Sequence, residues 1–323
     1  MSEPKEERRR GELEGARVLL TGASGFFGKW VGSALDLAGA QVMPLPPKNK
    51  GYDLRNESEA LQTVLSSRPD IIIHLAGTVG GIGANLGQPA TFFRDNMLMG
   101  MNVIHAAAVG KVKLVTVGTP ASYPASDEEG ALREEMFWAG YPDPATASFG
   151  IAKKALLAMM QAYRRQYKLS FSYLIPSNLY GPEDKYKGIL SSVIPSLIER
   201  FIAAREAKAP EVFCWGSGQA VRSFLYAGDA AKAVVRAASQ LDQDDPVNLP
   251  GTEERTIGEI AAMIAKLVKY EGKVLWDKTK PEGRRHLVLD GTQAKDLLDW
   301  EPETRLADGL KATVEWFEQD RKE

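Results

Sequence analysis

A glycine-rich turn near the N-terminus constrains the fold more than any other feature of the chain. The segment "ARVLLTGASGFFGKWVGSALDLAGA" places Gly22, Gly25 and Gly28 in the spacing G-x-x-G-x-x-G, between a short apolar run and an amphipathic stretch. Glycines at this spacing allow a tight turn and a close backbone approach to a pyrophosphate, and the helix that follows offers free N–H groups and a favourable dipole. The segment therefore predicts a strand–loop–helix unit that binds a dinucleotide.

Apolar and amphipathic segments alternate after this turn as far as Pro176. The expected strands are "AQVMPL", "PDIIIHLAG", "KVKLVTVG" and "LSFSYLIP", and the expected helices are "ESEALQTVLSSR", "PATFFRDNMLMGMNVIHAAAVG" and "FGIAKKALLAMMQAYRRQY". The strand "PDIIIHLAG", the third in the chain after that of the glycine turn and "AQVMPL", is continuously apolar, which is typical of a strand buried on both faces of a parallel sheet. Strands that alternate with helices predict an α/β fold with a doubly wound parallel sheet, the Rossmann fold.

The alternation is less regular beyond Pro176. A loop, "SNLYGPEDKYKG", precedes the helix "ILSSVIPSLIERFIAAREA", and short strands and helices continue to "LADGLKATVEWFEQD". We expect a Rossmann domain of residues 17–176 and 211–248, and a smaller α/β substrate domain of residues 177–210 and 249–323. Residues 1–16 are highly charged and lack an apolar core, so we expect a disordered tail there and no secretory signal.

Composition argues against several classes of function. The net charge of −2 gives no indication of nucleic-acid binding. A single cysteine, Cys214, allows no intrachain disulfide, and the three histidines lie far apart in the sequence, which is weak support for a metal site. No apolar run reaches the ~18 residues needed to span a bilayer. We therefore expect a cytoplasmic protein without a metal and without a membrane or nucleic-acid partner.

The choice between NAD and NADP depends on the end of the second strand. A carboxylate there would hold the adenosine ribose hydroxyls of NAD. The chain has "VMPLPPKNK" at this place, and Lys48 and Lys50 could instead meet a 2′-phosphate, or could belong to a solvated loop. We expect NADP, with NAD as the alternative. Asp53 in "YDLRN" is well placed to face the adenine, and helix capping is a competing role for the polar residues of that stretch.

Three motifs resemble those of the extended short-chain dehydrogenase/reductases: the glycine loop, "HLAG" after the third strand, and "FGIAK". The segment "HLAGTVGGIGANLGQPATFFRDNMLMGMNVIHAA" resembles the GDP-L-fucose synthase family more closely. The segments "IPSNLYGPED", "SSVIPSLIERF", "VFCWGSGQAVRSFLYAGDAA" and "WDKTKPEG" continue the resemblance in order, from Arg17 to about Phe317. It implies an NAD(P)-dependent reductase and epimerase of nucleotide sugars, and a homodimer built on the helices at residues 89–109 and 149–167.

The resemblance also implies the residues of the binding site. Cofactor contacts are expected at Gly22, Ser24, Gly25, Phe26, Phe27, Gly28, Asp53, Leu54, Leu75, Ala76, Gly77, Lys153, Pro176 and Asn178. Substrate contacts are expected at Val79, Gly80, Thr119, Phe149, Asn178, Lys187, Val193, Trp215, Arg222 and Lys280. An arginine and a lysine suit a diphosphate, and an aromatic ring suits packing against a base or sugar. Trp215 on its own could equally be a core residue of a strand.

The catalytic positions depart from the family pattern. The family uses a serine, a tyrosine and a lysine for proton transfer at C4, and a cysteine and a histidine for epimerisation. Lys153 is retained and Thr119 occupies the serine position. Phe149 stands at the tyrosine position, Ala121 at the cysteine position and Lys187 at the histidine position. A positioned acid or base contributes ~10²–10⁴-fold, so the family's chemistry cannot proceed unchanged.

Three groups could replace the tyrosine as proton donor. Thr119 could relay a proton to water or to the sugar's own hydroxyls, Tyr123 lies four residues further on, and Lys187 could act as an acid or base if desolvated. Lys187 could also be an exposed lysine that pairs with phosphate. We expect Thr119, Lys153 and Lys187 to act in an epimerase or 4-keto reductase of a GDP- or other NDP-hexose. The alternative is a catalytically silent nucleotide-sugar-binding or regulatory homologue.

Overall fold

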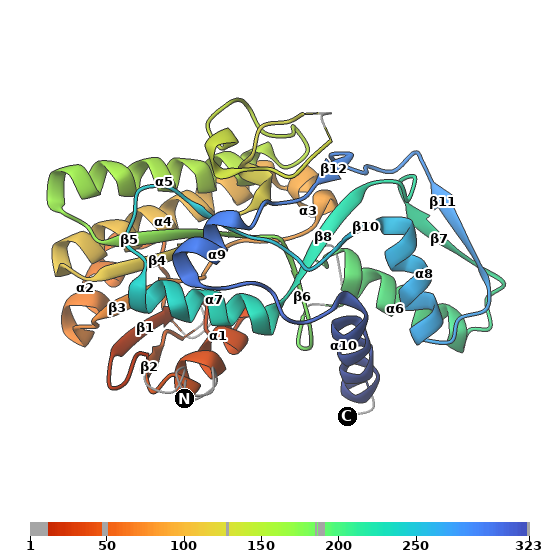
Figure 1. Ribbon diagram of the computed structural model, residues 1–323, viewed down its shortest axis with the longest axis horizontal. Helices are drawn as coiled ribbons and strands as arrows, with labels where there is room; N and C mark the ends of the chain where they lie inside the picture. The colour runs from red at the N-terminus through yellow and green to blue at the C-terminus, as the bar shows by residue number, and fades with distance from the viewer. Residues whose placement is uncertain (1–11, 47–50, 127–128, 185, 187–190, 322–323) are drawn as a thin grey trace.

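The computed structural model describes residues 12–46, 51–126, 129–184, 186 and 191–321 (Figure 1). Its largest sheet has six parallel strands in the order β2-β1-β3-β4-β5-β9. These strands are β1 (Arg17–Thr21), β2 (Gln41–Pro44), β3 (Ile71–His74), β4 (Lys113–Val117), β5 (Phe171–Pro176) and β9 (Val247–Leu249). Strands that alternate with helices favour a parallel sheet covered by helices, and the predicted doubly wound sheet is confirmed.

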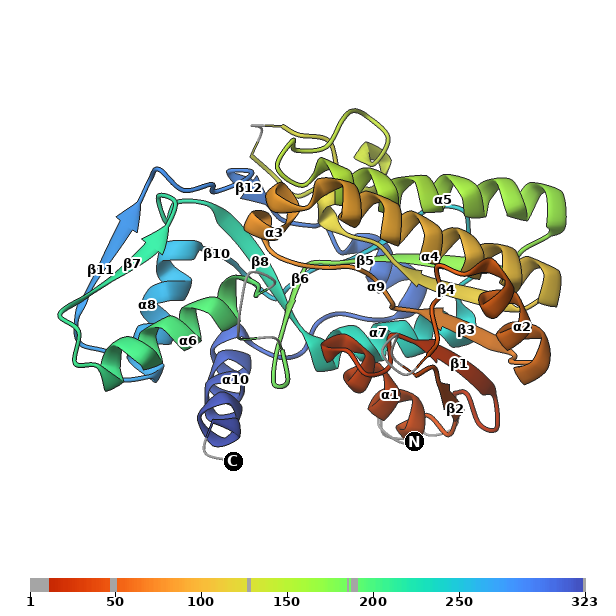
Figure 2. The ribbon, with the colours of Figure 1, turned by 180° about the vertical axis from the view of Figure 1, so that it is seen from behind.

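Helices cover both faces of this sheet (Figures 1 and 2). One face carries α1 (Phe26–Leu37), α7 (Ala227–Gln240) and α9 (Thr292–Leu298), and the other carries α2 (Glu57–Ser67), α4 (Pro89–Gly110) and α5 (Ala147–Tyr167). Successive strand residues point to opposite faces, so Leu20 and Ile73 lie in the core beneath α1 and α7, whereas Leu19 and Ile72 lie in the core beneath α4 and α5.

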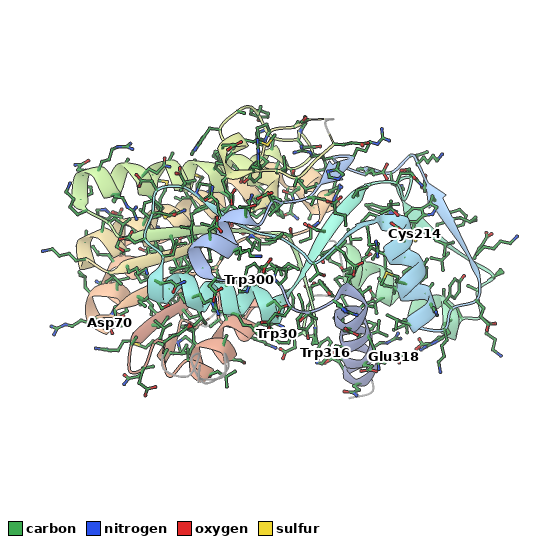
Figure 3. The ribbon with its side chains drawn as sticks, viewed as in Figure 1. Trp30, Asp70, Cys214, Trp300, Trp316 and Glu318 are labelled. Atoms are coloured by element: carbon green, nitrogen blue, oxygen red, sulfur yellow. The ribbon has the colours of Figure 1, made fainter. Side chains whose placement is uncertain are left out.

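A smaller part lies beside the carboxyl ends of these strands (Figures 1 and 2). Its strand β8 (Val221–Tyr226) pairs with β6 (Asn178–Tyr180), β10 (Glu254–Thr256) and β12 (His286–Leu287), and β7 (Glu211–Trp215) pairs with β11 (Lys273–Asp277). The helices α6 (Val193–Glu206), α8 (Ile257–Leu267) and α10 (Leu306–Asp320) share its core. Cys214 is buried in that core (Figure 3).

Two predicted boundaries differ from the structure. Residues 12–16, placed in the tail, pack on the sheet domain: Leu13 is buried, and its N–H donates to the carbonyl of Ala38. Residues 211–248 were assigned as a whole to the Rossmann domain, but β7 and β8 belong to the smaller sheets and only α7 and β9 to the larger one. The predicted loop after Pro176 contains β6, which forms because β8 offers it a partner.

Candidate functional site

The turn between β1 and α1 accepts only glycine at two of its positions. Gly22 has a φ of +73°, and a Cβ there would lie 2.7 Å from the backbone N of Ala76, beyond the end of β3. A Cβ at Gly28 would lie 2.0 Å from the carbonyl oxygen of Gly22. Gly25 is the N-cap of α1 and offers no side chain to the first N–H groups of the helix. The turn therefore brings backbone N–H groups to one place, as a pyrophosphate requires.

The end of β3 is held by a buried polar cluster that sequence reasoning missed. Thr21 Oγ1 accepts the N–H groups of Leu75 (3.2 Å) and Ala76 (3.1 Å) and lies 2.8 Å from Nδ1 of His74. Because both acceptor sites of Thr21 are used, its hydroxyl donates to Nδ1, and neutral His74 carries its hydrogen on Nε2. Burial, and secondarily the charge of Lys153, lower the pKa of His74 to about 3.

His74→Asn should flatten the acid side of the stability profile. The unfolded chain binds a proton at His74 near pH 6.5 and the folded chain only near pH 3, so the wild type loses stability as pH falls between these values. The slope from this group is at most about 1.4 kcal/mol per pH unit. Urea unfolding at pH 7.5, 6 and 5 measures it. Equal slopes in the variant and the wild type would contradict the neutral, buried state of His74.

Two buried asparagines hold the loop that follows β3. Asn96, on α4, donates to the carbonyls of Thr78 (3.0 Å) and Phe92 (2.7 Å) and accepts the N–H of Thr78 (3.2 Å). Asn85, on the short helix α3 (Ile82–Gly87), donates to the carbonyls of Gly80 (2.9 Å) and Gly81 (3.1 Å). The predicted substrate residues Val79 and Gly80 lie between these anchors. The sequence feature that could have indicated this role of Asn96 is an amide side chain on the otherwise apolar face of α4.

Lys153 lies buried where β3 and β4 end. Its Nζ donates to the carbonyl of Val117 (3.1 Å), and a Cβ at Gly77 would lie 3.8 Å from it. Burial lowers the pKa of Lys153 to about 8. The ammonium therefore stands beside the predicted cofactor residues Leu75, Ala76 and Gly77, and it releases its proton more readily than an exposed lysine does.

Three other predicted catalytic positions, Phe149, Ala121 and Thr119, lie near one another at the start of α5 and after β4. Phe149 precedes Lys153 by one turn of α5, and its ring packs edge-to-face on Phe92 with 6.2 Å between centroids. Ala84 and Ala121 complete this apolar cluster. Thr119 Oγ1 accepts the N–H of Ala121 (3.2 Å) and caps the 3₁₀ turn η2 (Pro120–Ser122). Phe149 and Ala121, the two positions predicted to lack the family's proton-carrying side chain, thus share one apolar cluster.

Tyr123 takes no part in this cluster. It is 1% exposed, its ring packs on Phe137, and its hydroxyl donates to Oδ1 of Asn248 (2.8 Å). Burial raises the pKa of this hydroxyl. The alternative in which Tyr123 supplies the missing proton is therefore wrong for this structure, because the hydroxyl is committed to the core.

The predicted nucleotide-binding residues come together from three elements of the smaller part. Trp215, at the end of β7, is 50% exposed, and a Cβ at Gly83 of α3 would lie 3.5 Å from its ring. Lys280 Nζ lies 5.9 Å from the centroid of the same ring. A Cβ at Gly283 would lie 3.8 Å from Nη2 of Arg222. The exposed face of Trp215 excludes the alternative of a core tryptophan.

Arg222 is a buried cation beside this surface. Its guanidinium donates to the carbonyls of Val221 (2.7 Å) and Arg284 (2.6 Å). Burial lowers its pKa to about 10, against the opposing charges of Glu282 and Asp143, so it remains charged at neutral pH. Val193 is the first residue of α6 and is 40% exposed. The start of α6 lies close to the loop after β3, since a Cβ at Gly81 would lie 2.9 Å from the carbonyl oxygen of Ser191, two residues before Val193.

The remaining predicted residues are placed with mixed outcomes. The carboxylate of Asp53 accepts hydrogen bonds from the backbone N–H (3.1 Å), Nε (3.0 Å) and Nη2 (2.6 Å) of Arg55, and Nη1 of Arg55 also pairs with Asp95 (2.9 Å). The capping role expected for this polar stretch falls to Asn56, which caps α2. Leu54 is buried next to Asp53. Pro176 ends β5 and Asn178 begins β6, whereas Ser24, Phe26 and Phe27 belong to the glycine turn and the start of α1. Lys48, Lys50 and Lys187 lie outside the described residues.

The described ranges contain neither a group of candidate metal ligands nor a helix suited to crossing a membrane. No three His, Cys, Asp or Glu side chains there are grouped as metal ligands would be. None of the helices in the same ranges combines the length and the apolar character that crossing a membrane requires.

The fold and the site together define a dinucleotide-binding α/β protein of the extended short-chain dehydrogenase/reductase class. The chain belongs to the NAD dependent epimerase/dehydratase family, whose sequence model matches residues 18–249. It is 34% identical to GDP-L-fucose synthase of Escherichia coli K12 over 317 residues, 94% of this chain and 98% of that one. It is 31% identical to GDP-L-colitose synthase of Yersinia pseudotuberculosis over 304 residues, 93% of this chain and 97% of the relative.

Solved structures of proteins with related names have the same fold as this chain. The NADP-bound GDP-L-fucose synthetase of Naegleria fowleri has a TM-score of 0.85 at 26% identity and covers 95% of this chain and 94% of its own. A GDP-6-OMe-4-keto-L-xylo-heptose reductase from C. jejuni has a TM-score of 0.87 at 24% identity, covers 95% of this chain and 98% of its own, and shows the fold. The resemblance to the GDP-L-fucose synthase family is confirmed, and the roles of individual residues stay predictions.

Proposed function

We propose that the protein is an NADP-dependent 4-keto reductase of a GDP-linked hexose that works with a changed set of acid and base residues. The main observation behind this proposal is that the lysine expected for reduction is present as Lys153, whereas the cysteine expected for epimerisation is replaced by Ala121. Lys153 lies at the ends of β3 and β4, as the reduction half of the family's chemistry requires. Ala121, at the position of the epimerisation cysteine, lies in an apolar cluster. Reduction therefore suits the site better than epimerisation.

The residues at the carboxyl ends of the strands fit a dinucleotide. The glycine turn would hold the pyrophosphate on the N-terminus of α1, Asp53 and Leu54 would lie near the adenine, and Lys153 would hold the nicotinamide ribose. Bound reduced NADP supplies a hydride to the substrate carbonyl. Lys48 and Lys50 remain the predicted contacts of the 2′-phosphate.

The smaller part supports a sugar nucleotide beside the cofactor. The exposed ring of Trp215, with Lys280 near its face, suits a base, and the buried charge of Arg222 suits a diphosphate. The sugar would then reach Thr119 and Phe149 past the loop of Val79 and Gly80. Guanine is favoured because two relatives are named GDP-L-fucose synthase and GDP-L-colitose synthase. The homodimer through α4 and α5 stays a prediction.

Binding and turnover test the proposal in sequence. We expect calorimetry to show NADPH binding at least about tenfold tighter than NADH, and GDP tighter than UDP, since about 1.4 kcal/mol separates such affinities. NADPH consumption with a GDP-4-keto-hexose should follow. Conversion of a sugar without net change in the NADPH absorbance band would favour epimerisation. Absence of both cofactor binding and turnover with every NDP-hexose tried would end the enzyme proposal.

A second candidate is a catalytically silent homologue that binds a nucleotide sugar. The apolar cluster of Phe149 and Ala121 with Ala84 and Phe92 favours it, because no member of that cluster carries a titratable proton. This protein would bind NADPH and GDP, turn over nothing, and gain no activity on Phe149→Tyr.

A further inference from the structure

The residues around the start of α5 indicate which group donates the proton to the carbonyl oxygen of the substrate. Lys153 follows Phe149 by four residues, so both side chains lie on the same face of the helix, one turn apart. A tyrosine at position 149 would differ from Phe149 by one oxygen at the end of the ring. Lys153 therefore lies one helical turn from the residue on which the family's hydroxyl would stand.

Other described groups near this place are less suited to supply a proton. Thr119 accepts the Ala121 N–H, and its hydroxyl can pass a proton on but does not ionise near neutral pH. The Tyr123 hydroxyl is committed to Asn248. His74 is neutral, and its Nδ1 is taken by the Thr21 hydroxyl. Lys153 is left as a cation with an exchangeable proton.

We propose that Lys153 donates the proton that the missing tyrosine would supply, through a water molecule standing in the place of the absent hydroxyl. This inference rests on the proposed reductase function and identifies the acid of that same site. An ammonium has three hydrogens, and one is donated to the Val117 carbonyl, so the others can serve a cofactor hydroxyl and a water.

The groups that face Lys153 make it an acid near neutral pH. Towards it β3 presents neutral His74, α4 presents the amide of Asn96, and β4 presents the carbonyl of Val117. None of the ion pairs among the described residues involves Lys153. Burial without a carboxylate partner lowers its pKa to about 8. An exposed lysine would hold its proton too firmly for efficient transfer at neutral pH.

The step balances with groups already named. The carbonyl carbon of the sugar gains a hydride, which the reduced nicotinamide supplies. The carbonyl oxygen gains a proton from the water, and the water takes the proton of the Lys153 ammonium. The products are the sugar alcohol, oxidised NADP and a neutral lysine amine, which recovers its proton from solvent. The rate of reduction should therefore fall tenfold per pH unit above about 8.

Lys153→Arg tests the proposal, with the adjacent Lys154→Arg as its matched control. Arginine keeps the positive charge but does not release a proton, since its pKa exceeds about 12. Lys154 is also buried on α5, but it donates to the Gly140 carbonyl (3.1 Å) and lies over the rings of Phe137 and Trp138. We expect Lys153→Arg to bind NADPH within about tenfold of the wild type, to lose about 10²-fold in kcat, and to lose the alkaline limb. Lys154→Arg should keep both.

A second measurement needs no substrate. The side-chain NMR resonance of lysine that disappears in Lys153→Arg should titrate near pH 8 in the wild type. A resonance that titrates at the ordinary lysine value would overturn the role of Lys153, and so would an alkaline limb that survives in Lys153→Arg. A wild type that binds NADPH but reduces no NDP-4-keto-hexose would instead overturn the proposed function.

Discussion

Phe149→Tyr should raise the rate of 4-keto reduction by about 10²-fold, the lower end of what a positioned acid contributes. The change adds one oxygen to a ring that is 8% exposed and already held against Phe92. Lys153 lies one turn away and would lower the pKa of the new phenol, because a nearby cation favours the phenolate. The phenol hydroxyl would replace the proposed water molecule as proton donor. Because it is bonded to the ring, its position would be fixed, whereas a water molecule can move.

The measurement is kcat for NADPH oxidation with a GDP-4-keto-hexose in both proteins. Tyr123→Phe is the matched control, since it changes a buried tyrosine hydroxyl that bonds Asn248 away from the cluster. It should cost about 1 kcal/mol of stability and leave kcat unchanged. If Phe149→Tyr binds NADPH and GDP normally and gains nothing, the sugar is held in a pose in which position 149 does not reach its carbonyl oxygen.

The fold was predictable because its main signals are local. The glycine turn depends on spacing within seven residues, and each central strand is an apolar run that needs no knowledge of its neighbours. Elements without such a signal were missed. The helix α3 has only six residues, too few to show a helical period, and β6, β10 and β12 are two- or three-residue strands that exist because β8 pairs with them.

The residues of the candidate site could be proposed one position at a time from the sequence, but their arrangement could not. The sequence pattern predicts that Phe149 and Ala121 are substitutions at catalytic positions, yet nothing in it indicates that they pack together with Phe92 and Ala84. Likewise, the pairing of Thr21 with His74 joins residues 53 positions apart through the register of β1 and β3. Such contacts depend on tertiary packing, so the apolar surroundings of Phe149 and Ala121 could not be predicted from the sequence.

Gly28→Ala should weaken NADPH binding by about 10²-fold, or roughly 2.7 kcal/mol. A Cβ at this position would lie 2.0 Å from the Gly22 carbonyl oxygen and 2.8 Å from Cα of Ala23. Both are backbone atoms, so no side chain can move aside, and the start of α1 must separate from the turn. The N–H groups that would hold the pyrophosphate then no longer converge. Overpacking of this kind also costs about 1–3 kcal/mol of stability.

Gly32→Ala, one turn further along α1, separates this effect from the general consequence of adding a methyl group to the helix. The nearest atom to a Cβ at Gly32 is Cδ2 of Leu20 at 3.8 Å, an ordinary van der Waals contact. Gly32→Ala should therefore bind NADPH like the wild type and gain up to about 1 kcal/mol of stability, since alanine favours the helix. Calorimetric titration of folded protein compares the three. If Gly28→Ala binds NADPH within threefold of the wild type, the N-terminus of α1 does not hold the phosphates. The backbone displaced by the methyl group added in Gly28→Ala would then affect binding no more than the methyl group added in Gly32→Ala.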